Sequence, residues 1–126
     1  MAIISIIDDD CIVREAMADL LQSLGYDART FESAEDFLES GSLAETSCLI
    51  TDLHMPGLDG LELQSRLIAQ GQPTPVTFVT AFPEERFRKR AMNAGAVGFL
   101  SKPFSEDSLI NCVETALSVA TNHADA

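Results

Sequence analysis

The chain has 126 residues, which is enough for one domain with a packed core and leaves no room for a second. Hydrophobic residues make up 46% of it, which argues against an intrinsically disordered chain. The net charge of −12 would be repelled by phosphate backbones, so we expect no direct binding of nucleic acid by this domain.

The cysteines and the first residues indicate the compartment. Cys11, Cys48 and Cys112 are odd in number and widely spaced, so we expect free thiols, buried or half-buried, in a reducing cytosol. The apolar run Ile3–Ile7 begins almost at once, without the positive region of a signal peptide, and no apolar run approaches the length of a membrane span. We therefore predict a cytoplasmic protein that does not contact a membrane.

Strands and helices alternate along the first part of the chain. Ile3–Ile7 is short, β-branched and almost wholly apolar, which predicts a strand buried on both faces. Apolar residues at helical spacing follow, and Gly25 closes that helix. Tyr26–Phe31 is predicted to be a second strand, and its polar residues favour a position near an edge of the sheet. Ser33 and Asp36 mark the start of a second helix.

The alternation continues to the carboxyl end. Cys48–Thr51 predicts a third buried strand, which ends at Asp52 and is followed by a loop containing proline and glycine. The same kinds of pattern predict the remaining elements: a helix over Leu61–Gln70, a strand over Val76–Val79, a fourth helix with Pro83 at its first position, a strand over Val97–Leu100, and a fifth helix capped by Ser105.

Five strand–helix units with short connections predict an α/β domain. We expect a five-stranded parallel sheet with helices on both faces, in a flavodoxin-like (βα)5 arrangement. We place this domain at residues 1–121 and treat residues 122–126 as a polar tail or the start of a linker. The sequence contains no Gly-rich phosphate loop, so any phosphate must be handled by carboxylates and a metal ion.

Polar side chains follow four of the predicted strands, at the edge of the sheet where ligands bind in such folds. Asp8–Asp10 follow the first strand, Asp52 the third, Thr80 the fourth and Lys102 the fifth. Carboxylates held close together repel and need a cation, and hard oxygen ligands suit Mg²⁺. With a lysine and a hydroxyl nearby, these groups can position and neutralise a transferring phosphoryl group, and a carboxylate can be its nucleophile.

Four short blocks of sequence carry a resemblance to a known family. They are IDDD at 7–10, TDLHMPG at 51–57, VTA at 79–81 and LSKPF at 100–104. In order and spacing they resemble the signature blocks of response-regulator receiver domains of bacterial two-component systems. Among these domains, they are most similar to the receivers of nitrogen-fixation-type transcriptional regulators. The resemblance covers nearly the whole chain.

The resemblance implies a chemistry for each matching position. Asp52 resembles the phosphoacceptor, which takes a phosphoryl group from a sensor histidine kinase in a Mg²⁺-dependent reaction. Asp9 and Asp52 would bind the Mg²⁺ directly, together with the backbone carbonyl of His54, and Asp8 would hold metal-bound water. Lys102 would bind the phosphoryl group. The domain would catalyse only its own phosphorylation and dephosphorylation.

The resemblance also implies a switch and a dimer. Thr80 would be the switch hydroxyl and Phe99 the switch aromatic, and the Lys102–Pro103 bond would be cis. Helices four and five would form a phosphorylation-dependent homodimer face. We expect basic residues of one copy to pair there with acids of the other, namely Arg86, Arg88, Lys89 and Arg90 with Glu106, Asp107 or Glu114.

Three alternatives stay open at this point. A haloacid-dehalogenase-type phosphatase would use Asp8 as nucleophile and Asp10 as acid and base. A degenerate receiver would act as an interaction domain without phosphorylation, and a flavin-binding domain is compatible with the fold alone. The position of Asp10 is open too, since it could replace a neighbour in the site, face solvent or cap the helix that follows.

Overall fold

The computed structural model describes residues 2–125, with side chains described as far as residue 118. Its strands are β1 (Ile3–Ile7), β2 (Asp27–Phe31), β3 (Cys48–Asp52), β4 (Val76–Thr80) and β5 (Gly98–Ser101). Its helices are α1 (Cys11–Ser23), α2 (Ala34–Glu39), α3 (Gly60–Ala69), α4 (Glu85–Asn93) and α5 (Glu106–Asp125), with a short 3₁₀ helix, η1 (Ser42–Glu45), before β3.

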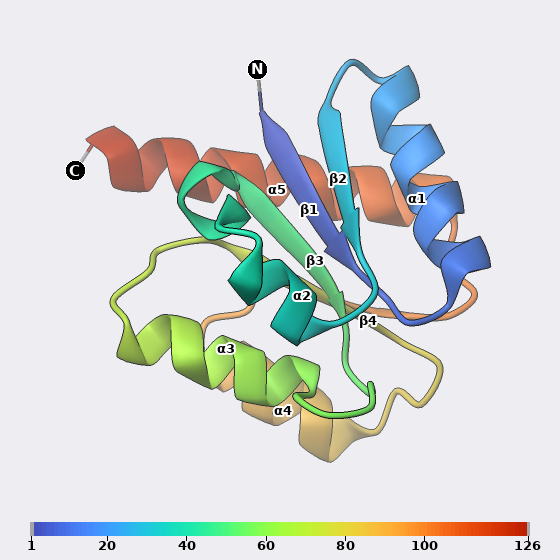
Figure 1. The fold of residues 1–126 in the computed structure, drawn as a ribbon, viewed down its shortest axis with the longest axis vertical. Helices are drawn as coiled ribbons and strands as arrows, with labels where there is room; N and C mark the ends of the chain where they lie inside the picture. Colours follow the sequence, from blue (N-terminus) through green and yellow to red (C-terminus); the bar gives the residue numbers. More distant parts are fainter. Residues whose placement is uncertain (1, 126) are drawn as a thin grey trace.

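The strands form one parallel sheet in the order β2-β1-β3-β4-β5. Figure 1 shows α1 and α5 on one face of this sheet and α2, α3 and α4 on the other. The predicted fold class is confirmed, and so is the edge position of the second strand. The edge strand β2 is only half-buried, whereas every residue of β3 and β4 is buried, because these strands have neighbours on both sides.

Alternate residues of the central strands pack into two separate hydrophobic cores, one on each face of the sheet. In β1 and β3, Ile4, Ile6 and Ile50 pack with α1 and α5, whereas Leu49 points to the opposite face. There it packs with Phe37 of α2 and apolar side chains of α3. Each fully buried side chain of this size contributes roughly 1.5–3 kcal/mol to folding, so a shift of one residue in register would be very costly.

The register brings the ends of the strands to one edge. Ile7 lies beside Thr51, Asp52 beside Val79, and Thr80 beside Ser101. The residues that follow β1 and β5 therefore emerge next to the last residues of β3 and β4. This alignment gathers the predicted site residues at the carboxyl edge of the sheet.

Local signals set several helix starts as expected. Ser33 accepts a hydrogen bond from the Asp36 N–H, and Ser105 Oγ accepts one from the Ser108 N–H at 3.1 Å. Gly25 has a φ of +94°, the left-handed conformation that closes α1. At α1 the Asp10 carboxylate is the cap, accepting from the N–H groups of the second and third residues of the helix.

Some boundaries differ from the sequence-based prediction. Pro83 is not the first residue of α4, because the helix begins at Glu85 with Glu84 as its N-cap. The Phe82 N–H donates to Thr80 Oγ1 and the Glu84 N–H donates to the Phe82 carbonyl, so these bonds hold the chain in a turn. The 3₁₀ helix η1 was not predicted. Helix α5 continues across the predicted domain boundary at residue 121, which stays a prediction.

The three cysteines differ in exposure. All three thiols are free; Cys48 is buried and Cys112 half-buried as predicted, but Cys11 is exposed because it opens α1 at the surface. None of the helices in the described part of the chain has the length and apolar character that a membrane crossing requires.

Gly60 lets α3 begin directly beneath the end of β3. A Cβ atom at this position would lie 2.5 Å from the backbone oxygen of Asp52 and 3.0 Å from the Phe78 ring. A backbone atom cannot turn aside as a flexible side chain can, so any larger residue would displace the strand end that carries Asp52.

Candidate functional site

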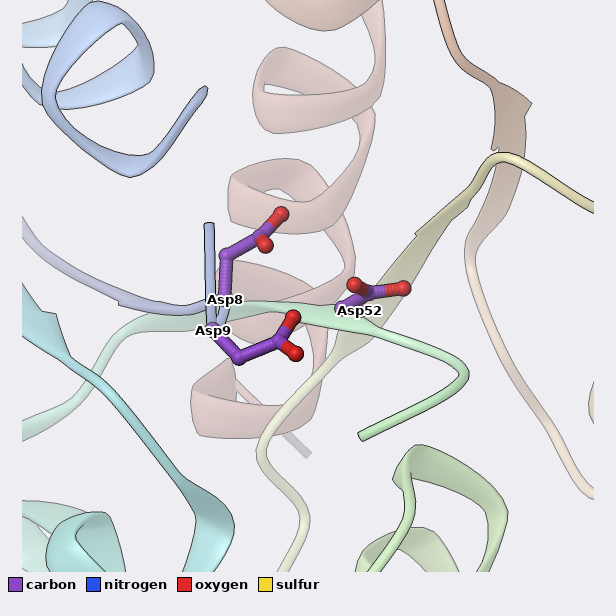
Figure 2. Close-up of side chains that lie close together, drawn as sticks. All are labelled: Asp8, Asp9 and Asp52. Atoms are coloured by element: carbon purple, nitrogen blue, oxygen red, sulfur yellow. The ribbon is translucent and has the colours of Figure 1, made fainter. Parts of the chain in front are cut away.

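Three carboxylates meet at the carboxyl edge of the sheet. Figure 2 shows the side chains of Asp8 and Asp9, which follow β1, gathered with that of Asp52 at the end of β3. One oxygen of each lies within 4.8 Å of the others. Asp8 is 0% exposed and Asp52 is 6% exposed, whereas Asp9 is open to solvent. Two buried acids therefore form the floor of the cluster, and the exposed acid forms its rim.

Lys102 is the cation that faces this cluster. Its Nζ lies 2.8 Å from Asp8 Oδ2 and 3.2 Å from Asp52 Oδ2. Burial by itself would lower the pKa of Lys102, but hydrogen bonding and attraction from Asp8 and Asp52 outweigh it and raise the pKa. The ammonium therefore stays charged at neutral pH. One ammonium opposes three carboxylates, so the site carries excess negative charge.

The excess negative charge affects the pKa of Asp52. Its pKa is raised, first because burial disfavours the ionised form and second because Asp8 repels it. Lys102 and the backbone N–H of His54, which donates to Asp52 Oδ1 at 3.3 Å, favour the ionised form but do not outweigh these two causes. A second cation at the site would relieve this cost.

Asp10 lies outside the cluster. Its carboxylate accepts hydrogen bonds from the N–H groups of Ile12 and Val13 and so caps α1. Its own N–H donates to Asp8 Oδ1 at 2.9 Å. The third acid of the run thus has a structural partner, which separates it from the other two.

The two predicted switch residues lie on the neighbouring strands. Thr80 is fully buried at the end of β4, and its backbone oxygen accepts from the Lys102 N–H at 2.8 Å. Its hydroxyl oxygen accepts from the Phe82 N–H at 3.0 Å. Phe99 is half-buried on β5, and its ring centroid lies 6.4 Å from that of Phe78.

Comparisons with known proteins agree with this geometry. The sequence pattern of the family described as "Response regulator receiver domain" matches residues 4–114. The chain belongs to this family. It is 38% identical over 117 residues to the transcriptional regulatory protein FixJ of Bradyrhizobium diazoefficiens, covering 93% of this chain and 57% of FixJ. It is also 36% identical to the response regulator protein TmoT of Ectopseudomonas mendocina, covering 94% of this chain and 54% of TmoT.

Solved structures give the same result. The response regulator StyR superposes with a TM-score of 0.91 at 38% identity, covering 98% of this chain and 63% of StyR. The FixJ-N crystal structure superposes with a TM-score of 0.84 at 32% identity, covering 94% of both chains. This receiver domain spans about half the length of the curated relatives it matches. The resemblance found in the sequence is confirmed.

The receiver domain offers donors that suit Mg²⁺. Asp8 Oδ2 is buried, and the Lys102 ammonium at 2.8 Å is the contact that compensates its charge. Asp52 adds a hard carboxylate oxygen in the floor of the cluster, and Asp9 adds one on the open side. A small divalent cation with oxygen ligands fits this set. The peptide bond before Pro103 is cis, as the resemblance implied.

An aromatic cluster above the site was missed in the sequence. The His54 side chain is exposed, but its ring meets Phe82 edge-on at 5.7 Å and Phe87 at 5.1 Å between centroids. Phe82 is 64% exposed. A large apolar residue in a polar loop was the available signal. The three rings connect the loop after β3 with the start of α4.

Two charged side chains that hold the site loops were missed as well. Glu35 of α2 accepts from the Leu58 N–H at 3.4 Å, in the loop after β3. Arg14 of α1 donates from Nη1 to the backbone oxygen of Asp8 at 2.6 Å. Neither residue belongs to the four signature blocks. The partner of Glu35 is distant in the sequence and the partner of Arg14 is a backbone atom, so the pattern of side chains along the chain did not indicate these contacts.

An apolar groove of about 540 Å³ opens beside Lys102, between α1 and the start of α5. Val13, Met17 and Phe104 line it together with Ile12, which is 77% exposed. One end of the groove therefore reaches the residue that contacts Asp52.

Proposed function

We propose that this receiver domain accepts a phosphoryl group on Asp52, in a Mg²⁺-dependent reaction, from the phosphohistidine of a sensor histidine kinase. The observation that carries the proposal is the cluster of Asp52 with Asp8 and Asp9, opposed by a single ammonium, that of Lys102. A buried carboxylate in a site with excess negative charge needs a cation, and phosphoryl transfer requires positioning and charge neutralisation.

The proposed roles follow from this arrangement. An Asp52 oxygen would form the new bond to phosphorus while the bond from phosphorus to the histidine nitrogen breaks and its electron pair stays on the imidazole. Mg²⁺, held by Asp9, Asp52 and the His54 backbone carbonyl, would neutralise charge on the phosphoryl oxygens. Asp8 would hold metal-bound water. Lys102 would move its ammonium from the free carboxylate to a phosphoryl oxygen.

The same contacts disfavour the alternatives. A phosphatase that uses Asp8 as nucleophile needs that carboxylate accessible, but it is fully buried between the Asp10 N–H and Lys102. Asp10 would have to act as acid and base, whereas its carboxylate caps α1. A degenerate receiver has no need of the clustered acids and the ammonium. We propose a cytoplasmic signalling domain that catalyses only its own phosphoryl transfer and dephosphorylation.

Mass spectrometry tests the proposal directly. With acetyl phosphate and Mg²⁺ the protein should gain one phosphoryl group, because the small donor bypasses the kinase. With a chelator in place of Mg²⁺ the gain should fall by at least about 10²-fold, since the metal ion stabilises the charge of the transition state by several kcal/mol. Equal labelling with and without Mg²⁺ would contradict the metal requirement.

We further propose that Thr80 transmits phosphorylation to α4. Its hydroxyl now accepts from the Phe82 N–H, and Phe82 contacts the His54 ring. A phosphoryl oxygen on Asp52 would recruit this hydroxyl, and Phe99 would occupy the space that the threonine vacates. The turn before α4 would then shift, so the phosphate would bias a two-state element.

The proposed output is a homodimer through α4 and α5. Arg86 and Arg88 already pair with Glu84 and Glu85 of their own segment. Within the part of the chain whose side chains are described, no ion pair engages Lys89 or Arg90. These two are the basic residues that we expect to meet the acids of α5 in a second copy, namely Glu106, Asp107 or Glu114.

A Thr80→Ala variant tests the switch. It should still accept phosphate, but it should dimerise more weakly than the wild type on activation, because the hydroxyl that couples Asp52 to α4 is absent. Sedimentation with and without beryllofluoride, a phosphoryl mimic, measures both proteins. Equal dimerisation of the two would refute the coupling, and unchanged mass in the wild type would refute the dimer.

We propose that the kinase domain that carries the phosphohistidine docks over the groove beside Lys102. The donor must approach Asp52, and this groove is the apolar surface that continues from the site. Replacing the exposed Ile12 with Asp should slow transfer from the kinase by about 10-fold or more, as for a central apolar contact. Labelling by acetyl phosphate should not change. Equal slowing with both donors would place the defect in the site instead.

A further inference from the structure

Arg14 is a half-buried cation that contacts the backbone of the acidic cluster. It lies in α1, and its side chain is only 11% exposed. Nη1 donates to the backbone oxygen of Asp8 at 2.6 Å, and Nη2 lies 3.9 Å from Glu32 Oε1. Taking a guanidinium out of water is costly unless its donors are used. The guanidinium thus donates a hydrogen bond to the residue that follows β1 rather than only to solvent.

Other atoms of this turn make hydrogen bonds of their own. The Asp8 N–H donates to the Phe31 carbonyl at 3.2 Å, and Asp8 Oδ1 accepts from the Asp10 N–H. The Asp10 carbonyl accepts from the Arg14 N–H at 3.0 Å. Among the described residues no backbone N–H donates to the Asp8 carbonyl, and the Arg14 guanidinium is its donor.

The Asp8 carbonyl belongs to the same rigid plane as the Asp9 nitrogen. Because the peptide unit is planar, fixing this carbonyl fixes the plane from which Asp9 starts. The direction of the Asp9 side chain then depends on few remaining torsions. Asp9 is the exposed acid of the cluster, and no hydrogen bond to its carboxylate is found within residues 2–118, so its position rests on the backbone.

We propose that Arg14 is a positioning residue of the Mg²⁺ site. By holding the peptide plane between Asp8 and Asp9 it keeps the Asp9 carboxylate within reach of an ion shared with Asp52. This inference rests on the proposed function, since it takes these acids as the metal ligands. Groups that orient ligands from behind typically contribute 10–100-fold to metal affinity.

One effect opposes the positioning. The charge of Arg14 repels a cation, so its removal would by itself tighten Mg²⁺ binding. Glu32 lies 3.9 Å from the guanidinium and offsets part of that charge, and repulsion across a partly solvated site is screened. We therefore expect the lost orientation to dominate. An Arg14→Lys variant keeps the positive charge but loses the planar guanidinium with its several N–H donors. It therefore separates the effect of charge from the effect of orientation.

The test measures Mg²⁺ affinity by calorimetry in the full chain. Arg14→Met keeps the apolar stem, and its dissociation constant should rise by roughly 10–100-fold, with Arg14→Lys in between. Arg29→Met is the matched control, because Arg29 is likewise an arginine held by ion pairs, with Asp27 and Glu45, but it lies on the edge strand β2 and no ion pair within the described residues joins it to a site residue. Its affinity should equal that of the wild type.

Phosphorylation by acetyl phosphate gives a second readout. The Mg²⁺ concentration for half-maximal labelling should rise in Arg14→Met by the same factor, while the rate at saturating Mg²⁺ stays within about twofold, because Asp52 and Lys102 are unchanged. A general loss of structure would lower the maximal rate instead. If Arg14→Met fails to fold, Arg14→Lys decides.

The outcomes are distinguishable. Wild-type affinity, or tighter binding, in both Arg14 variants would overturn this inference and leave the proposed function intact. A wild-type protein that binds no Mg²⁺ would overturn both. Weaker binding in Arg14→Met and Arg29→Met alike would assign the effect to general destabilisation and would also overturn the inference.

Discussion

Replacing Asp52 with asparagine should abolish phosphorylation by acetyl phosphate, a loss of at least about 10³-fold, because the amide cannot act as the nucleophile. Phosphopeptide analysis by mass spectrometry would measure it. Asp10→Asn is the matched control, since asparagine caps a helix as well as aspartate and the residue lies outside the cluster. Its labelling should stay close to that of the wild type.

Asp8→Asn separates the two phosphoryl chemistries. In the receiver mechanism this variant loses charge behind the metal ion and should label more slowly, still on Asp52. In the phosphatase mechanism it should not label at all, and Asp52→Asn should label normally. Undiminished labelling of Asp52→Asn, on the same peptide that is labelled in the wild type, would refute the proposed function.

Removing charge from the site should stabilise the metal-free fold. The pKa of Asp52 is raised in the folded state by burial and by Asp8, whereas an unfolded aspartate titrates near 3.9. The folded state therefore binds the proton more tightly, and stability falls as pH rises from the unfolded pKa through the folded one. At a pH above the folded pKa the wild type bears this full cost and Asp52→Asn does not. Asp52→Asn should melt at a higher temperature.

Mg²⁺ should reverse that order. At a concentration about 100 times the dissociation constant, binding adds about 2.7 kcal/mol to the wild type, which corresponds to a melting shift on the order of 10 °C. Asp52→Asn lacks a ligand and should respond weakly. The exposed Asp19→Asn on α1 is a control that should follow the wild type.

Calorimetry across pH, with and without Mg²⁺, would measure both effects. Without metal, the gap between Asp52→Asn and the wild type should close as the pH is lowered through the folded pKa of Asp52 toward the ordinary carboxyl range. A wild type indifferent to Mg²⁺ would count against the metal site. A metal-free Asp52→Asn that melts below the wild type would show that the lost contact with Lys102 outweighs the relieved repulsion.

Features that depend on a few neighbouring residues were predictable from the sequence. The bounds of β1 agree with the prediction because its apolar, β-branched run contrasts with the acids that follow. The caps at Ser33 and Ser105 act on N–H groups three residues away, so the chain itself carries the signal. The four signature blocks predicted the family, and the parallel sheet brings their residues to one edge.

Other features depend on partners that are distant in the chain. Strands β3 and β4 run on through Asp52 and Thr80 because the neighbouring strands pair with these residues, and α4 begins late because the Thr80 hydroxyl holds the Phe82 N–H. Strand ends and helix starts of this kind depend on hydrogen-bonding partners from other parts of the chain. The local sequence pattern carries no information about these partners.

The division of labour among the three consecutive acids was decided only by the tertiary structure. Their side chains are chemically identical, and only packing buries Asp8 against Lys102, leaves Asp9 exposed at the rim and turns Asp10 to the start of α1. The contact of Arg14 with the Asp8 carbonyl has the same origin. Burial and backbone direction at one point depend on elements from the whole chain, so sequence alone determined which groups meet but not how each one is held.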